Sequence, residues 1–155
     1  MTDAVVVHPK SLYEADYPLW AHRQAAYLRA RQWDKLDIAA LAEEIDDMGR
    51  RDKDAVESYL ENLLFHLLKW HYQPAHRSSS WLGSIRVARE RIALKIERAP
   101  SLAGYPAMVL EDAYRIARKR DPENDAVRIE HLPDNCPWTI EQVLDANWLP
   151  EMPPS

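Results

Sequence analysis

The chain has 155 residues, of which 46% are hydrophobic and 29% charged, a balance typical of a globular domain and not of a disordered chain. Its three glycines cannot form the glycine-rich loops that bind nucleotide phosphates, and its net charge of −5 argues against nonspecific binding to nucleic acid. Its single cysteine, Cys136, excludes an internal disulfide, and no stretch approaches the ~20 apolar residues that a membrane-spanning helix needs.

The first predicted helix follows residues 1–11, which we expect to form a flexible leader. Pro18 is a residue favoured in the first turn of a helix. The residues after it, from Leu19 to Trp33, supply apolar side chains for one buried face.

Apolar residues then recur at helical spacing on both sides of Gly49. Asp37 is a suitable N-cap for a first stripe, which consists of Ile38, Leu41, Ile45 and Met48. A second stripe continues in phase and consists of Val56, Tyr59, Leu63, Leu67 and Trp70. Because glycine can end a helix or only weaken it, two helices and one long bent helix both fit this pattern. Pro74 closes it.

Two further helices are predicted before a polar connection. Ser79 or Ser80 would cap the first, whose apolar side carries Trp81, Ile85, Ala88, Ile92 and Ile96. It ends at Ala99, because a residue before proline is disfavoured in a helix. Ser101 would cap the second, whose stripe is Leu102, Tyr105, Val109, Ala113 and Ile116. Pro106 fits only if that helix begins near it.

The C-terminal part is predicted to be mostly connection. Residues 121–137 are polar and contain proline, so we expect a long surface segment there. Thr139 would cap a short last helix, after which Trp148 to Pro150 fold back onto the body. These patterns predict an all-α fold, a single-domain bundle of five to six helices over residues 12–150, with a tail at 151–155.

Three ionisable residues fall on the core-facing sides of successive predicted helices. At 100° per residue, Glu44, His66 and Arg89 each lie among apolar neighbours. An unpaired buried charge costs several kcal/mol, so inward groups of opposite sign tend to meet. We therefore expect a partly buried Glu44–Arg89 ion pair with His66 beside it.

This predicted cluster has a structural and a functional interpretation. A polar brace that fixes the register of the helices is the structural one. A ligand-binding or catalytic site is the functional one, because perturbed ionisable groups gather at active sites. Further residues could flank such a site: Glu43, Lys69, Tyr59, Trp70 and Trp81.

Metal binding and nucleophilic catalysis have little support. His66 and His71 are five residues apart, whereas metal-binding helix pairs use a spacing of three or four. Cys136 has no evident base to activate its thiol. We expect no catalytic residue, no metal site and no cofactor.

Several short strings occur together in one order. They are LAEEIDDMG, HLLKWHYQP, SWLGSIRVAR, PSL, AYRIA and CPWT. In this order and spacing the chain resembles the domain of unknown function 29 family, small bacterial helical proteins, over about residues 12–150. The resemblance implies an all-helical fold and no established activity. The recurrent positions of the family include Glu44, His66 and Arg89, and this chain departs from the family pattern at Leu82 and Ala88.

Two classes of function remain open. The first is a non-enzymatic, cytoplasmic protein that binds another protein or itself and has a regulatory role, with neither membrane nor nucleic acid as its partner. Abundant tryptophan and tyrosine favour it, and an exposed patch at Trp20, Trp33, Trp138 or Trp148 would support it. The second is a small-molecule-binding protein or enzyme that uses Glu44, His66 and Arg89.

Overall fold

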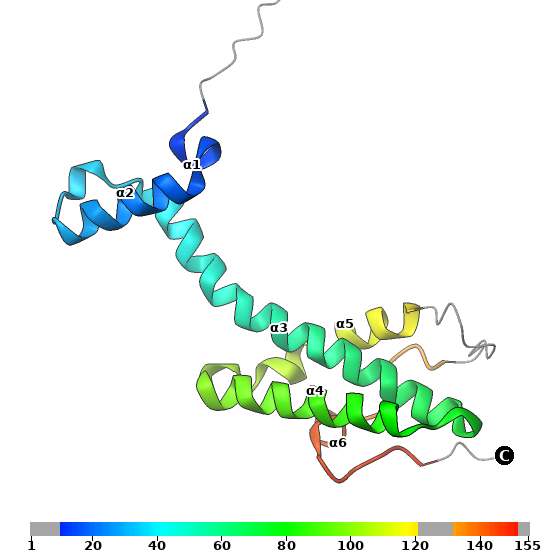
Figure 1. Cartoon of the computed structure of the whole chain (residues 1–155). Coiled ribbons are helices and arrows are strands. Elements are labelled where there is room, and N and C mark those ends of the chain that lie inside the picture. The colour runs from blue at the N-terminus through cyan, green and yellow to red at the C-terminus, as the bar shows by residue number, and fades with distance from the viewer. Residues whose placement is uncertain (1–9, 121–131, 152–155) are drawn as a thin grey trace, which may run out of the picture. The chain divides into compact units, whose positions relative to one another are not determined.

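The computed structural model describes residues 10–120 and 132–151, and every regular element within them is helical (Figure 1). The all-α fold class is confirmed. The chain divides into two compact units, Met1–Gly49 and Arg50–Ser155. A single domain over residues 12–150 stays a prediction. The flexible leader and the tail fall mostly on residues outside the described ones.

Residues 10–49 of the N-terminal unit form three helical segments and the beginning of a long helix. These are α1 (Leu12–Ala15), α2 (Tyr17–Arg29), η1 (Trp33–Lys35) and the first residues of α3 (Ile38–Tyr72). Asp16 caps α2 by accepting from the backbone N–H of Leu19. Trp20 is buried, and its ring meets that of Tyr13 edge to face at 4.7 Å.

The predicted boundaries of the first two helices need one correction. α2 ends at Arg29 and not at Trp33. Arg31 then adopts a left-handed conformation with φ of 56°, which turns the chain out of the helix. Asp37 does cap α3, because its Oδ1 accepts from the backbone N–H of Ala40 at 3.2 Å.

The two in-phase stripes around Gly49 belong to one helix. α3 runs through Gly49 without a break from Ile38 to Tyr72, so the single-helix alternative is the correct one. A Cβ added at Gly49 would meet no atom within 4 Å, and its backbone φ is not positive. Neither packing nor turn geometry therefore requires glycine at this position.

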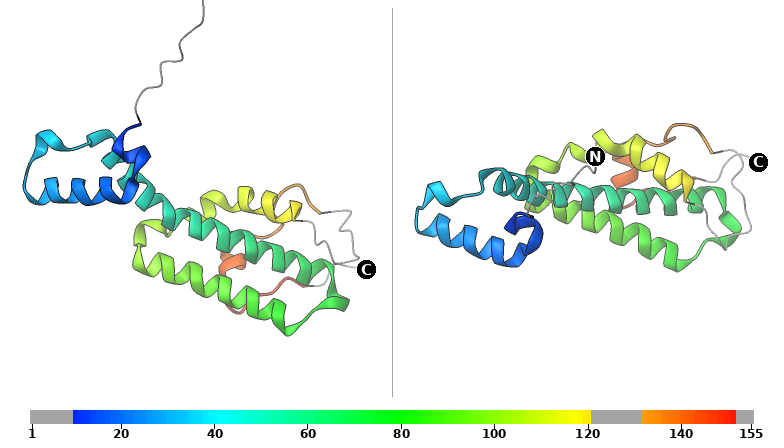
Figure 2. Two further views of the ribbon diagram at one scale, coloured as in Figure 1. Left: turned by 45° about the horizontal axis from the view of Figure 1, so that its top comes forward. Right: turned by 90° about the horizontal axis from the view of Figure 1, so that it is seen from above.

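The C-terminal unit holds the main core. It consists of α3 from residue 50 onward, η2 (Pro74–His76), α4 (Ser79–Arg98), η3 (Pro100–Leu102), α5 (Tyr105–Lys119) and α6 (Ile140–Leu144). Both views of Figure 2 show α4 running alongside the later part of α3. Leucines of α3, isoleucines of α4 and Tyr114 of α5 fill the interior. Burying such side chains stabilises the fold by about 25 cal/mol per Å² of apolar area.

The predicted stripes of this unit largely match its core. Ile85, Ala88 and Ile92 are buried on α4, although Ser78, one residue before the expected position, is the N-cap. Ser101 does not cap α5; it lies within η3, and α5 begins near Pro106, the arrangement that proline allows. Ile116 is exposed, and Ala117 takes its place in the core.

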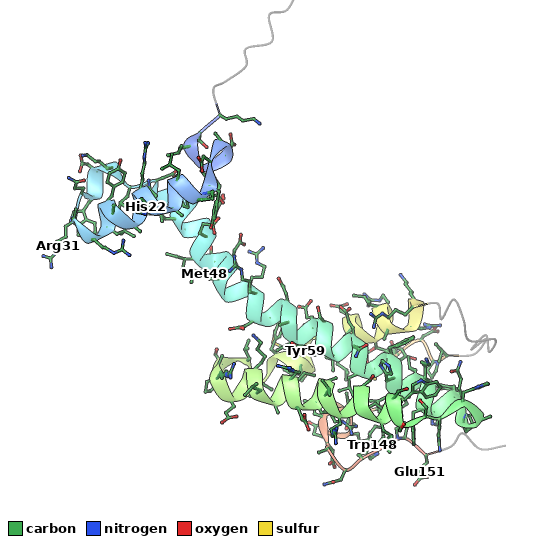
Figure 3. All side chains as sticks on the ribbon, viewed as in Figure 1. His22, Arg31, Met48, Tyr59, Trp148 and Glu151 are labelled. Atoms are coloured by element: carbon green, nitrogen blue, oxygen red, sulfur yellow. The ribbon has the colours of Figure 1, made fainter. Side chains whose placement is uncertain are left out.

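The C-terminal segment packs back onto the unit. Thr139 and Gln142 form a capping box at the start of α6, as the position of Thr139 predicts. Trp138 and Trp148 meet edge to face at 5.8 Å, and Trp148 packs against the core. His71 donates from Nδ1 to the backbone oxygen of Glu151. Figure 3 labels both Trp148 and Glu151. Most of the predicted connection, residues 121–131, lies outside the described part.

Candidate functional site

Glu44 of the N-terminal unit accepts hydrogen bonds from two tyrosines. The hydroxyl of Tyr13 donates to Oε1 at 2.8 Å, and the hydroxyl of Tyr17 donates to Oε2 at 2.7 Å. The hydrogen bond to Glu44 is the main reason that the pKa of Tyr13 rises to about 12, with burial adding to it. Glu44 thus joins α1 and α2 to the beginning of α3.

Arg89 lies in the C-terminal unit and is 6% exposed. Its Nε donates to the backbone oxygen of Val143 at 2.8 Å and so connects α4 to α6. Its Nη2 is buried and has no hydrogen-bond partner. Burial lowers the pKa of Arg89, an effect that the charge of Asp145 partly opposes. Arg89 is therefore a buried cation whose neighbours only partly compensate its charge.

His66 has a local partner on its own helix. A ring nitrogen, Nδ1, lies 2.8 Å from the backbone oxygen of Asn62. Because a carbonyl oxygen only accepts, Nδ1 carries the proton and Nε2 is the free acceptor of the neutral ring. Burial is the main cause that lowers the pKa of His66, and the charges of Lys69 and Arg120 lower it further.

The predicted Glu44–Arg89 ion pair, with His66 beside it, stays a prediction. Glu44 belongs to the N-terminal unit, and the other two residues belong to the C-terminal unit. Within the C-terminal unit, Arg89 donates to a backbone carbonyl. The partners seen for these inward polar groups include tyrosine hydroxyls for Glu44 and backbone carbonyls for His66 and Arg89.

Two of the predicted flanking residues, Lys69 and Trp81, are in contact with each other. Lys69 Nζ lies over the ring of Trp81 at 4.3 Å, a cation–π contact between α3 and α4. The ring of Trp70 is covered by Arg77 instead, at 4.6 Å. Tyr59 packs partly buried against the core, and Glu43 is exposed.

The partners of Glu44 and Arg89 could be anticipated only in part. Tyr13 and Tyr17 are four residues apart, a spacing that can place two hydroxyls on one side, but the sequence does not show which acceptor they meet. Val143 acts through its backbone oxygen, which carries no sequence signal at all.

Two adjoining hollows lie beside Arg89, between α4 and α6. The first has a volume of about 300 Å³ and is lined by Arg86, Arg89, Glu90, Ala93, Leu144 and Ala146. The second has a volume of about 370 Å³ and is lined by Arg89, Ile92, Ala93, Ile96, Glu97 and Leu144. The two share Arg89, Ala93 and Leu144, and their walls are mainly aliphatic.

Metal binding and thiol reactivity each set requirements for the described residues. Among residues 10–120 and 132–151, no group of three or more histidine, cysteine, aspartate and glutamate side chains could hold a metal ion. Burial raises the pKa of the Cys136 thiol to about 11, so the thiol stays protonated near neutral pH.

A row of apolar side chains is exposed in the N-terminal unit. On α3, Ile38, Ile45 and Met48 are 64%, 66% and 63% exposed, so most of the first predicted stripe is not buried. Ala40 and Glu44, on a neighbouring side of the helix, are the more buried residues. Trp33 is also 60% exposed, the one member of the four tryptophans considered above that lies on the surface.

Comparison with known families identifies the class of protein. The chain matches the family model described as Domain of unknown function DUF29 over residues 12–149, and it belongs to that family. The search of curated proteins and the search of solved structures returned no match. Within the described ranges, no helix combines the length and the apolar character needed to cross a membrane.

Proposed function

We propose that this protein is a non-enzymatic interaction protein whose N-terminal unit binds an amphipathic helix of another protein. The binding surface consists of Ile38, Leu41, Ile45 and Met48 and is here called the α3 face. Its exposure is the observation that carries the proposal, because monomeric proteins seldom leave a contiguous row of large apolar side chains in water. The bacterial origin and cytoplasmic location expected from the sequence belong to the same proposal.

The spacing of the α3 face fits a helical partner. Its four residues follow each other at intervals of three, four and three, which is the a/d pattern of a helix that packs against another helix. Leu41 is half-buried, and the other three are exposed along the same side. Burying one such side chain contributes about 1.5–3 kcal/mol, so three of them contribute about 4.5–9 kcal/mol, which corresponds to a millimolar to micromolar affinity.

The charge of this segment favours a basic partner over a second copy of the chain. Between Ile38 and Gly49 there are four carboxylates and no basic side chain. A second copy would bring the same four carboxylates to the interface, and like charges disfavour such pairing. A helix with lysine or arginine beside its apolar row would be attracted to the same surface.

A designed peptide tests this proposal directly. We expect a peptide of about three heptads, with isoleucine and leucine at a and d and lysine at e and g, to bind the chain in fluorescence anisotropy. Ile45→Ser should weaken binding at least about tenfold, because one buried anchor is lost. The matched control is Met108→Ser, which removes an exposed apolar side chain from the C-terminal unit and should leave binding unchanged.

Three results would count against the proposal. The first is equal binding of a peptide with glutamate in place of lysine, because charge would then play no part. The second is equal loss of binding in Ile45→Ser and Met108→Ser. The third is concentration-dependent dimerisation, seen in analytical ultracentrifugation, that Ile45→Ser abolishes, because a second copy would then be the partner.

A further inference from the structure

We infer that the two hollows beside Arg89 form a binding site for a small apolar monocarboxylate. This site lies in the C-terminal unit and is independent of the α3 face. It differs from the predicted cluster, because it uses Arg89 without Glu44 or His66. We call it the Arg89 groove, defined by Arg89, Ala93 and Leu144, the residues that both hollows share.

The unmet hydrogen-bonding capacity of Arg89 is the first argument. The side chain is more than nine-tenths buried, and Nε is satisfied by Val143, but Nη2 has no partner. A buried donor without an acceptor is unfavourable, and a buried cation without a counter-charge more so. Nη2 itself is shielded from solvent, so a carboxylate in the groove would face the part of Arg89 that lines the hollows and would add a negative charge to that of Asp145.

The walls of the groove are the second argument. Ile92, Ile96 and Leu144 present aliphatic surface next to the guanidinium, and Ala93 leaves space between them. Hollows of about 300 and 370 Å³ lie in the size range of small-ligand sites. An aliphatic body can lie along these walls while its carboxylate faces Arg89.

The charges around the groove limit the ligand to one negative charge. Glu90 lies in an exposed ion pair with Arg86 at 3.9 Å, and Glu97 and Asp145 are exposed as well. Exposed carboxylates are screened by water, so they weaken the pull of a buried cation without cancelling it. They would repel a phosphate or another polyanion much more strongly than a monocarboxylate.

Calorimetric titration with octanoate tests the inference, with octanol as the uncharged counterpart. We expect octanoate to bind the full chain and octanol to bind at least about tenfold more weakly, because octanol lacks the charge-assisted contact to Arg89. Ala93→Phe fills the space common to the two hollows from the solvent side and should weaken octanoate binding at least about tenfold. Met108→Phe adds the same aromatic area at an exposed position outside the groove and should bind as the unmodified chain does.

Arg89→Lys gives an independent variant that keeps the charge. This variant should weaken the binding of octanoate more than the binding of octanol, because lysine lacks the planar guanidinium group of arginine. The inference is overturned if octanoate does not bind, if octanoate and octanol bind equally well, or if Ala93→Phe binds octanoate as tightly as Met108→Phe. None of these results depends on the α3 face, since peptide binding there is measured with a different probe.

Discussion

Glu44 and Arg89 illustrate how single polar residues are accommodated inside a helical protein. Glu44 accepts from two tyrosine hydroxyls at a half-buried position, while Arg89 donates to a backbone carbonyl and keeps one buried nitrogen without a partner. The first arrangement satisfies the charged group, and the second leaves binding capacity unused. The two residues therefore have different expected roles, a structural one for Glu44 and a ligand-binding one for Arg89.

The hydrogen bond between Tyr13 and Glu44 predicts a stability loss in alkali. The pKa of Tyr13 is about 12 in the folded chain and 10.0 in the reference state, so folding favours the protonated hydroxyl. The contribution of this hydrogen bond to the free energy of unfolding is complete below pH 10 and is lost as the pH rises toward 12. Glu44→Gln should move the ionisation of Tyr13 back toward its ordinary pKa, measured by ultraviolet titration of tyrosinate. Glu43→Gln is the control and should shift the pKa of Tyr13 much less. An equal shift in the two variants would contradict the assignment of the raised pKa to the hydrogen bond with Glu44.

Removal of Arg89 predicts a second stability change. Arg89→Ala should lower the free energy of unfolding by about 1–3 kcal/mol, because the buried carbonyl of Val143 loses its donor. Chemical denaturation monitored by circular dichroism measures this change. Arg86→Ala, three residues earlier on the exposed side of α4, should change it by less than about 0.5 kcal/mol. A loss of similar size in both variants would show that the Val143 contact contributes little.

At the scale of the element, α3 shows how far local pattern determines structure. The in-phase stripes on both sides of Gly49 allow one helix, and the surrounding helix formers outweigh a single glycine. Asp37 and Thr139 are caps at the predicted positions and satisfy nearby backbone N–H groups, whereas the predicted cap Ser101 lies within η3. Such short-range rules need no knowledge of the tertiary structure.

Gly49→Ala should stabilise α3. No atom lies within 4 Å of the position of the added methyl group, and the backbone is already helical. The gain expected from helix propensity is about 0.8–1 kcal/mol in the free energy of unfolding, measured by urea denaturation. Gly83→Ala, on α4 with equally open surroundings, is the matched comparison and should give a similar gain. Destabilisation by Gly49→Ala alone would mean that this point of α3 needs to bend.

At the scale of the whole molecule, the sequence predicts which residues are buried much better in one unit than in the other. In the C-terminal unit the predicted stripes match the core, because Leu63, Leu67 and Ile85 pack against other helices of the same unit. On the N-terminal part of α3 the same type of stripe is exposed at Ile45 and Met48. Periodicity predicts an apolar face but not what covers it, and the Glu44–Arg89 prediction likewise rests on the assumption of one common interior.

The exposed α3 face therefore carries the central claim, that this protein binds an amphipathic basic helix through its N-terminal unit. Nuclear magnetic resonance of the ¹⁵N-labelled chain, titrated with the lysine-flanked peptide described above, tests it most directly. The account predicts chemical-shift changes concentrated on residues 33–48, and their loss in Ile45→Ser while Met108→Ser retains them. Shift changes confined to the C-terminal unit, or none at all, would contradict it.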